Sequence, residues 1–388
     1  MDLDAFLALL TPRGRKALDE AVELTGTDPV KAATQLRKTY DSVLTSAALT
    51  QAGLRERAVA KFGDDARLMY FTPHGLEQST RAEVAAHRAA RLSEAAGGPV
   101  RVLDACCGIG GDALALARAG HTVDAVELDP LTAAVARANA EALGLRVSVR
   151  VGDAGDVAPE DYGALFADPA RRTSKGRTFD PQAYSPPWPV VMDLVGRARR
   201  SCLKVAPGIP YEYIPEAAEA EWVSFKGEVK EAALWTPGPA GRRATILPGG
   251  HTLTATGVRP AVGELGRYVY EPDGAAIRAH LVGEVAEMVG GRLLDPMIAY
   301  IAGDEAVETP WAARYAVEEA LPFSLKRLRA ALRAREIGNV TIKKRGSAVD
   351  IERLRRDLRL SGDKSGVIIL TRIMNHPFVL ICLGLPPA

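Results

Sequence analysis

The chain has 388 residues, a length that predicts two or three domains rather than one. With 47% hydrophobic and 25% charged residues it has the composition of a folded globular protein, which excludes a wholly disordered chain. The net charge of +1 excludes a protein that is basic over its whole surface, so any surface for nucleic acid must be local.

Cysteines and histidines are few and scattered, which argues against a metal site or a disulfide framework. Cys106 and Cys107 are adjacent, Cys202 and Cys382 lie far from them, and the six histidines show no paired metal-ligand spacing. The first residues do not have the pattern of a signal peptide, and no apolar run approaches the ~20 residues of a membrane span. We expect a soluble, cytoplasmic protein with neither a metal nor a membrane partner; the sequence does not indicate its oligomeric state.

Residues 1–95 are expected to form an N-terminal helical region. Apolar residues recur at helical spacing near its start, at Leu3, Phe6, Leu7 and Leu10. Asp28 followed by Pro29 predicts the beginning of a helix, because proline is favoured in the first turn. The Ala-Ala-Gly-Gly-Pro run at 95–99 predicts the end of this region.

Residues 96–258 alternate between apolar β-type segments and helical segments at short intervals. The strand candidates are VRVLDACC, HTVDAVELD, RVSVRVGDA, ALFADPA, SCLKVAP and EWVSFKGEVKEAALW. This alternation predicts an α/β domain with a doubly wound, Rossmann-like parallel sheet.

Residues 262–388 predict a smaller α+β module. Helical patterns cover 275–289, 324–336 and 350–360, and strand patterns are NVTIKKRG, GVIILTRI and FVLICL.

The strongest functional signal is a glycine-rich turn after the first strand of the sheet. Asp104 ends that strand, and Gly108 and Gly110 follow within the turn. Glycines permit positive φ angles and a close approach of a ligand to the backbone. The dinucleotide fingerprint is not met because Ala113 occupies its third glycine position, which disfavours a dehydrogenase. A tight structural turn in another α/β fold is the alternative.

Two further carboxylates follow at the ends of the next strands. Glu127 ends the second strand, and Asp153 follows the third. Ligands of open α/β sheets bind at the carboxyl ends of the strands, so we expect these acids and Asp104 to share one pocket. Asp129, which precedes Pro130, is instead expected to cap a helix.

The glycine turn and the strand-end acids, in this order, resemble the class I S-adenosylmethionine-dependent methyltransferases. The resemblance implies that the cofactor is S-adenosyl-L-methionine, with Asp104 facing its ammonium end, Glu127 its ribose hydroxyls and Asp153 its adenine amino group. It implies further cofactor contacts from the turn and the strand ends, at Cys106, Gly108, Gly110, Leu128, Ala154 and Asp168.

The fourth strand ends in Asp168-Pro169-Ala170-Arg171-Arg172. Amino-methylating members of the family carry Asp or Asn here, followed by Pro-Pro and an aromatic residue, so the second proline and the aromatic are missing. The resemblance still implies that Asp168 and the Pro169 carbonyl are catalytic, because both accept hydrogen bonds from a substrate amino group. Arg171 and Arg172 are expected either to contact substrate phosphate or to pair with nearby acids.

The segment Ser185-Pro186-Pro187-Trp188 resembles the fourth motif of the cap guanine-N2 methyltransferases, but no apolar strand precedes it. We interpret it as the start of a helix, in which Trp188 either covers the substrate or packs as an ordinary core or surface residue. A cysteine nucleophile is disfavoured, because Cys106 and Cys107 lie in the glycine turn and Cys202 enters a strand.

The order DPARR, SPPW and LKVAPGI resembles a methyltransferase subfamily that carries a C-terminal THUMP-like domain, and this resemblance covers most of the chain. Segment 70–89 is similar to the part of that subfamily that precedes the sheet. There Gln78, Ser79 and Thr80 either approach the cofactor or cap a helix. The THUMP-like domain implies RNA as a partner.

Positive charge is concentrated late in the chain. Residues 324–359 hold 12 Lys or Arg against four acids, whereas the rest of the chain holds 37 basic and 44 acidic residues. We expect a turn to present Lys343, Lys344 and Arg345 to solvent, where they suit RNA phosphates. A solvated helical face is the alternative.

The favoured function is therefore methylation of a base nitrogen in structured RNA, a tRNA or an rRNA. The alternatives are a small-molecule methyltransferase and a catalytically silent RNA-binding protein that retains the fold.

Overall fold

The computed structural model describes residues 1–170, 172–173, 176–177 and 180–384. The chain divides into two compact units, which are residues 1–219 with 231–240 and residues 220–230 with 241–388. The division into three domains at 95/96 and 258/262 stays a prediction. No helix in the described part of the chain is both long and apolar enough to cross a membrane.

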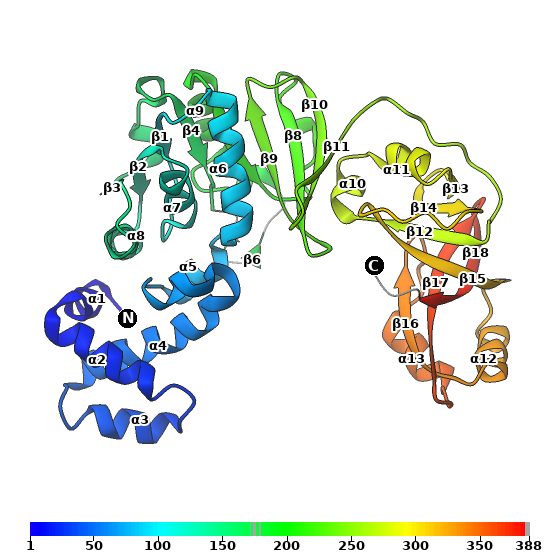
Figure 1. Cartoon of the computed structure of the whole chain (residues 1–388), viewed down its shortest axis with the longest axis horizontal. Coiled ribbons are helices and arrows are strands. Elements are labelled where there is room, and N and C mark those ends of the chain that lie inside the picture. Colours follow the sequence, from blue (N-terminus) through cyan, green and yellow to red (C-terminus); the bar gives the residue numbers. More distant parts are fainter. Residues whose placement is uncertain (171, 174–175, 178–179, 385–388) are drawn as a thin grey trace. The chain divides into compact units, whose positions relative to one another are not determined.

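The N-terminal residues form helices, as predicted (Figure 1). These are α1 (Leu3–Leu10), α2 (Pro12–Glu23), α3 (Pro29–Leu36), α4 (Ser42–Phe62), η1 (Gly63–Arg67), α5 (Pro73–Gln78) and α6 (Ala82–Ala96). The side chain of Asp28 accepts backbone N–H bonds in the first turn of α3, so the helix start predicted at Asp28-Pro29 is confirmed. In α1 the core face runs through Phe6 and Leu9, whereas Leu7 is 46% exposed.

One hydrophobic core joins these helices to the helices of the sheet, because Phe6 and Phe71 belong to the same cluster as Ile109 and Val135. The buried Asn139 side chain connects the two parts. Its Oδ1 accepts the Tyr70 N–H at 2.6 Å, and its Nδ2 donates to the Ile109 carbonyl at 2.9 Å. The segment before the sheet is thereby held against the glycine turn.

The central sheet is doubly wound, which confirms the predicted fold class. Its parallel strands are β1 (Arg101–Asp104), β2 (Thr122–Glu127), β3 (Val147–Val151), β4 (Ala164–Ala167) and β7 (Ser201–Val205). The antiparallel β9 (Glu228–Thr236) pairs with β7, and the strand order is β11-β10-β8-β9-β7-β4-β1-β2-β3. The order reverses between β1 and β4, and such a switch point is where open α/β sheets bind ligands.

The sheet's helices are α7 (Gly111–Arg118), α8 (Pro130–Ala142) and α9 (Trp188–Arg197). The short elements around them are η2 (Ala154–Asp156), η3 (Pro159–Asp161), β5 (Arg172–Thr173), β6 (Gly176–Arg177), η4 (Pro181–Ala183) and η5 (Tyr211–Tyr213). The predicted start of a helix after the two prolines is confirmed, because α9 begins at Trp188.

The second unit contains strands β8 (Glu219–Phe225), β10 (Gly241–Leu247) and β11 (His251–Thr254), and a mixed seven-stranded sheet of order β13-β14-β12-β15-β18-β17-β16. The strands of that sheet are β12 (Tyr268–Pro272), β13 (Arg292–Asp295), β14 (Ile298–Gly303), β15 (Ala312–Pro322), β16 (Ile337–Lys344), β17 (Lys364–Ile373) and β18 (His376–Gly384). The predicted α+β character is confirmed. One prediction is wrong: residues 275–289 form two helices, α10 (Gly274–Arg278) and α11 (Val282–Met288), because the chain turns at His280 with φ 55°.

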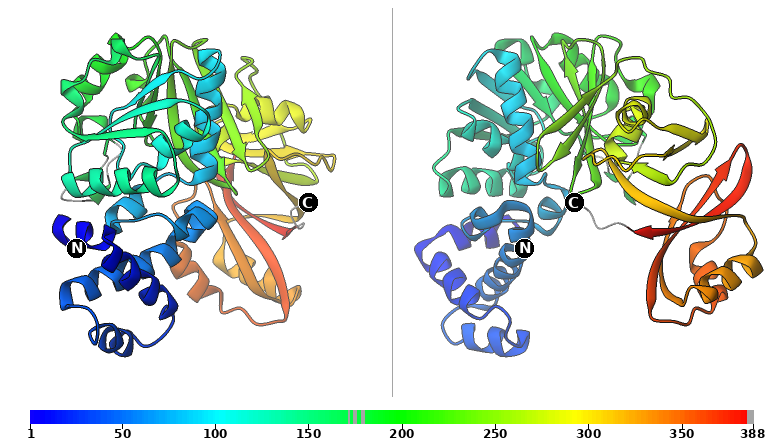
Figure 2. Two further views of the ribbon diagram at one scale, coloured as in Figure 1. Left: turned by 60° about the vertical axis from the view of Figure 1, so that its left-hand side comes forward. Right: turned by 45° about the vertical axis from the view of Figure 1, so that its right-hand side comes forward.

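The remaining helices, α12 (Leu325–Ala334) and α13 (Ile351–Leu358), bury their apolar faces against this sheet. In Figure 2 they are the orange helices beside the orange and red strands. Their buried residues are Leu328, Leu332, Leu354 and Leu358. The opposite faces, which carry the charged residues, therefore remain in solvent.

Candidate functional site

A cavity of about 1190 Å³ opens at the carboxyl ends of β1, β2, β3 and β4. This volume exceeds the roughly 300–1,000 Å³ of pockets that hold one drug-sized ligand. The cavity is lined by most of the residues predicted for the site, which are Cys106, Gly108, Glu127, Leu128, Asp153, Ala154, Asp168 and Pro169. It has room for a cofactor together with a substrate group.

The glycine turn needs its glycines for their backbone conformation. Gly108 and Gly110 have φ angles of 54° and 90°, in the left-handed region that side chains disfavour. Gly108 lines the cavity, whereas Gly110 is buried against α8, where an added Cβ would lie 3.5 Å from Ala136. Gly110 therefore packs the turn onto α8, and Gly108 presents backbone to the cavity.

Glu127 organises the turn as well as facing the cavity. Its Oε2 accepts the Gly108 N–H and its Oε1 accepts the Asp129 N–H, each at 3.0 Å. Each carboxylate oxygen keeps lone pairs for a further donor. Asp129 caps α8 as predicted, since its Oδ1 accepts the Thr132 N–H at 2.8 Å.

Asp153 and Ala154 lie at the cavity wall, where β3 gives way to η2. The Asp153 side chain is exposed, and its Oδ1 accepts the Gly155 N–H at 2.8 Å. The second carboxylate oxygen is therefore available to a donor in the cavity.

Asp104 differs from the other strand-end acids, because it is fully buried and is not among the lining residues. Its Oδ1 accepts the Cys106 N–H at 3.3 Å, while its Oδ2 has no hydrogen-bond partner among the described residues. Burial, reinforced by the charge of Asp112, raises the pKa of Asp104 well above its usual range. The expectation that all three acids line one cavity is thus wrong for Asp104, which lies behind the turn.

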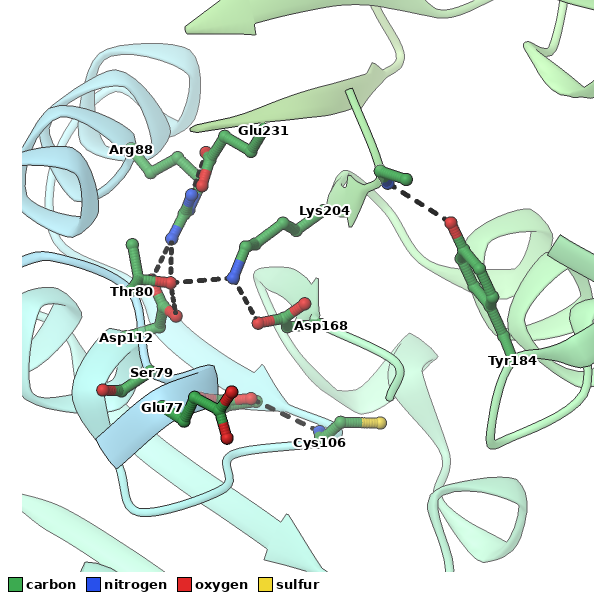
Figure 3. A network of polar contacts seen from close by, with 12 residues as sticks. Glu77, Ser79, Thr80, Arg88, Cys106, Asp112, Asp168, Tyr184, Lys204 and Glu231 are labelled. Carbon is green, nitrogen blue, oxygen red and sulfur yellow. Dashed lines mark hydrogen bonds and ion pairs between the residues drawn. The ribbon is translucent and has the colours of Figure 1, made fainter. Parts of the chain in front are cut away.

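A chain of buried polar contacts leads from Asp168 into the protein, and Figure 3 shows it. The Lys204 ammonium lies 2.5 Å from Asp168 Oδ2 and donates to Thr80 Oγ1 at 2.8 Å. Thr80 donates in turn to Asp112 Oδ2 at 2.9 Å. Sequence reasoning missed Lys204; the available signal was one lysine between apolar residues in the strand SCLKV.

Arg88 anchors the far end of this chain, between the carboxylates of Asp112 and Glu231. Burial opposes the charge on Asp112, but Arg88 and Lys204 outweigh it, so the pKa of Asp112 is lowered. The network therefore brings side chains of α6, α7, β7 and β9 together with Asp168, which follows β4.

The segment before α6 forms one wall of the cavity through Gln78, Ser79 and Thr80. The Lys61 ammonium of α4 fixes that wall, because it donates to the carbonyls of Leu76, Glu77 and Ser79. The N-terminal helices thus contribute directly to the shape of the site.

Trp188 has a packing role. It is 8% exposed, is not among the lining residues, and lies edge-on between the rings of Tyr184 and Tyr213. Of the alternatives that the sequence left open, the structure favours the core residue over a cover for the substrate.

The predicted arginine contacts stay predictions. Arg171 lies outside the described residues, and only the backbone of Arg172 is described, in β5.

The two cysteines of the glycine turn do not have the properties of a nucleophile. Burial raises the pKa of both Cys106 and Cys107 well above the usual range, which keeps the thiols protonated and disfavours a cysteine nucleophile.

The basic turn of the second unit is less exposed than predicted. Lys343 lies 2.5 Å and Arg345 3.6 Å from the carboxylate of Glu271, and only Lys344 of the three basic residues is exposed. The prediction that all three face solvent is wrong, because Glu271 on β12 draws two of them against the sheet. Further exposed basic residues lie on the two helices and directly after α13. They are Lys326, Arg327 and Arg333 on α12, Arg353, Arg355 and Arg356 on α13, and Arg359, which follows α13.

Models of three protein families match the chain. A methyltransferase domain matches residues 102–167, a THUMP domain-like family matches residues 312–383, and a domain of unknown function matches residues 2–58. The first match ends at the last residue of β4, and the second begins with β15.

Curated relatives and a solved structure extend these matches over most of the chain. An uncharacterized S-adenosylmethionine-dependent methyltransferase of Mycobacterium tuberculosis is 36% identical over 350 residues, which are 85% of this chain and 94% of that protein. An uncharacterized RNA methyltransferase of Parasynechococcus marenigrum is 30% identical over 140 residues, 32% of this chain and 30% of that protein. A crystallised protein of Porphyromonas gingivalis W83, named a candidate methyltransferase, has a TM-score of 0.78 at 21% identity and covers 96% of this chain and 98% of its own.

Proposed function

The chain belongs to the S-adenosylmethionine-dependent methyltransferases, and from this premise we propose that it methylates a base nitrogen of structured RNA, a tRNA or an rRNA.

The residues around the cavity fit S-adenosylmethionine. Glu127 keeps lone pairs for the ribose hydroxyls, and Asp153 with the Ala154 backbone suits the adenine edge. Asp104 is fully buried and is not among the residues that line the cavity, so we assign it no direct contact with the cofactor. When bound, the cofactor provides an electrophilic methyl group.

One observation carries the assignment of the receiving group: Asp168 and Pro169 line the same cavity as Glu127 and Asp153. The Asp168 carboxylate and the Pro169 carbonyl are acceptors, so they suit an N–H-bearing nucleophile. Hydrogen bonds from the amino group to both oxygens would orient its lone pair toward the methyl. Orientation of this kind supplies much of the rate in a displacement that needs little other chemistry.

The charge of the cavity favours a base over a phosphate. Within the described part of the chain its lining includes seven carboxylates and neither Lys nor Arg; the acids are Asp112, Glu127, Asp129, Asp153, Asp156, Asp168 and Asp193. A neutral base turned out of the nucleic acid can enter such a cavity, while the phosphates stay outside it. We propose that other residues of the chain hold the backbone, with Arg171 and Arg172 still predicted to contact substrate phosphate.

Three observations support RNA as the macromolecule. The second unit contains the THUMP domain-like match, and one relative is named an RNA methyltransferase. In addition, the outward faces of α12 and α13 carry a group of exposed basic side chains that suits phosphates. We assign RNA contact to this α12–α13 face, defined by Lys326, Arg327, Arg333, Arg353, Arg355, Arg356 and Arg359.

The test is transfer of labelled methyl groups from S-adenosylmethionine to total RNA, small metabolites and protein from a strain that lacks this gene. We expect label in an RNA fraction, in a methylated base. Label in the metabolite fraction alone would instead establish a small-molecule methyltransferase. RNA binding without any transfer would establish a silent RNA-binding protein.

A further inference from the structure

Lys204 is a buried cation beside the cavity to which none of the motifs assigns a role. It lies on β7, and its neighbour Leu203 pairs with Ala167, the last residue of β4. Asp168 directly follows Ala167. The side chain is 5% exposed, and that of Asp168 is 22% exposed. A buried ammonium is costly unless it is paired and hydrogen-bonded, so a lysine at this position in an apolar strand calls for an explanation.

The position of the ammonium group is determined from two sides. It contacts Asp168 Oδ2 at 2.5 Å and Thr80 Oγ1 at 2.8 Å, and Thr80 is held in turn by Asp112. Beyond Asp112 stands Arg88, which also pairs with Glu231. Because the ammonium group is buried and is hydrogen-bonded on both sides, Lys204 has little freedom to leave Asp168 (Figure 3).

We propose that Lys204 is a positioning residue for methyl transfer, which holds the Asp168 carboxylate in one orientation so that it accepts the hydrogen bond of the substrate amino group. This inference rests on the proposed function, because it takes Asp168 as the acceptor of that amino group. Lys204 is not among the residues that line the cavity, and it therefore acts through Asp168.

The surroundings of Asp168 explain why a cation is needed there. The groups that interact with it are Asp104 of β1, Cys106 of the turn and Lys204 of β7. Asp112 of α7 follows beyond Lys204 and Thr80, and Arg88 of α6 is already shared by Asp112 and Glu231 of β9. Lys204 is the cation in direct contact with Asp168, and it also takes Oδ2, which leaves Oδ1 for a donor in the cavity.

The central experiment compares Lys204→Met with the wild-type protein. We expect kcat for RNA methylation to fall about 10- to 100-fold, the range expected when a charge-assisted hydrogen bond is weakened, with KM for RNA nearly unchanged. Lys204→Arg should recover part of this loss, because it keeps the charge. Lys230→Met is the matched control, since Lys230 also pairs with an acid, Glu228, but lies outside the cavity.

A double variant separates positioning from an independent effect. If Lys204 acts through Asp168, Lys204→Met combined with Asp168→Asn should lose no more activity than Asp168→Asn alone. Losses that multiply would overturn the inference, and so would a wild-type kcat in a folded Lys204→Met protein.

A binding measurement keeps the test independent of RNA. Calorimetry would compare S-adenosylmethionine, whose sulfur is positively charged, with its neutral demethylated product. Removal of the Lys204 charge should raise the ratio of the two affinities several-fold in favour of the cation, whereas Lys230→Met should leave it unchanged. An unchanged ratio in Lys204→Met would contradict an effect of the Lys204 charge at the methyl end of the cofactor.

This measurement also separates the role of Lys204 from the proposed function. If the wild-type protein methylates no RNA, the proposed function fails, while the ratio of affinities still decides the role of Lys204. Should Lys204→Met fail to fold, Lys204→Gln, which removes the charge but keeps a hydrogen-bond donor for Asp168 and Thr80, should change the ratio in the same direction.

Discussion

The cavity and the α12–α13 face carry opposite charges although the whole chain is almost neutral. The cavity is lined by carboxylates, and the cations that belong to it, Arg88 and Lys204, are buried behind its wall. The second unit shows the reverse: Glu271 holds Lys343 and Arg345 against the sheet, while the basic residues of the helices face solvent. At the cavity two cations are buried behind the wall, and in the second unit two cations are held against the sheet by an acid, so the charge offered to a ligand cannot be read from a count over a segment.

The largest effect is expected at the cavity. Asp168→Asn should lower kcat for methyl transfer by roughly 100-fold or more, because the charged acceptor of the amino group is lost, while the affinity for the cofactor stays near that of the wild type. Methyl-transfer kinetics and calorimetry measure the two effects separately. The control is Asp161→Asn, an exposed acid outside the cavity. Turnover that survives in Asp168→Asn would show that Asp168 is misassigned.

A second substitution tests the cofactor end of the same cavity. Glu127→Gln should weaken binding of S-adenosylmethionine by about 10-fold, since a charge-assisted hydrogen bond contributes roughly 1.5–3 kcal/mol and the amide keeps only part of it. Calorimetry measures the change, and Glu141→Gln, an exposed acid on α8, serves as the comparison. Equal affinities of Glu127→Gln and the wild type for S-adenosylmethionine would show that Glu127 does not bind the ribose.

A third test concerns the basic region and separates its exposed cations from its paired ones. Replacing Arg327, Arg333 and Arg356 by Gln should lower the slope of log affinity for RNA against log salt concentration by about 2, if each contacts one phosphate. Replacing Lys343 and Arg345 by Gln should change the slope little but destabilise the fold, because Glu271 would lose its partners. Binding titrations at several salt concentrations measure the slopes. A larger change of slope for Lys343 and Arg345 than for Arg327, Arg333 and Arg356 would assign the RNA contact to the basic turn at 343–345 instead.

The smallest effect is expected at His121, which lies outside both regions. Burial lowers the pKa of His121, and its Nδ1 accepts the Val100 N–H at 3.0 Å, a bond that protonation removes. The folded state therefore binds this proton less readily than the unfolded state, so stability is lost as the pH falls below about 6.5. Denaturant unfolding between pH 7 and 5 should show a loss of about 1 kcal/mol or less from this group, and a flatter profile in His121→Gln. Parallel profiles of stability against pH for the wild type and His121→Gln would exclude His121 as the origin of the pH dependence.

Local sequence patterns predicted the central sheet and the acids of the cavity that directly follow its strands. Glu127 and Asp153 directly follow strands whose period and order are visible in the sequence, and Asp129 with Pro130 marks the start of α8. The contribution of Lys204 was not predictable, because its partner Thr80 lies 124 residues earlier and only the tertiary fold brings them together. The pairing of Lys343 with Glu271 spans 72 residues and was missed for the same reason.

The breaks in regular structure were also hidden from the sequence. Residues 275–289 have the apolar spacing of one helix, yet His280 adopts a positive φ and divides it. Asp104 has the sequence context of a cavity acid, but the close turn of the chain at Cys106 places its carboxyl behind the wall. Neither feature alters the hydrophobic pattern on which the predictions depend.

The central claim is that the carboxyl ends of β1 to β4 hold S-adenosylmethionine with its methyl end toward Asp168. A crystal structure of the protein with the demethylated product bound tests it most directly. The account predicts ribose hydroxyls on Glu127, adenine beside Asp153 and Ala154, and the sulfur facing Asp168. A nucleoside bound outside this cavity, or one that contacts neither Glu127 nor Asp153, would contradict it.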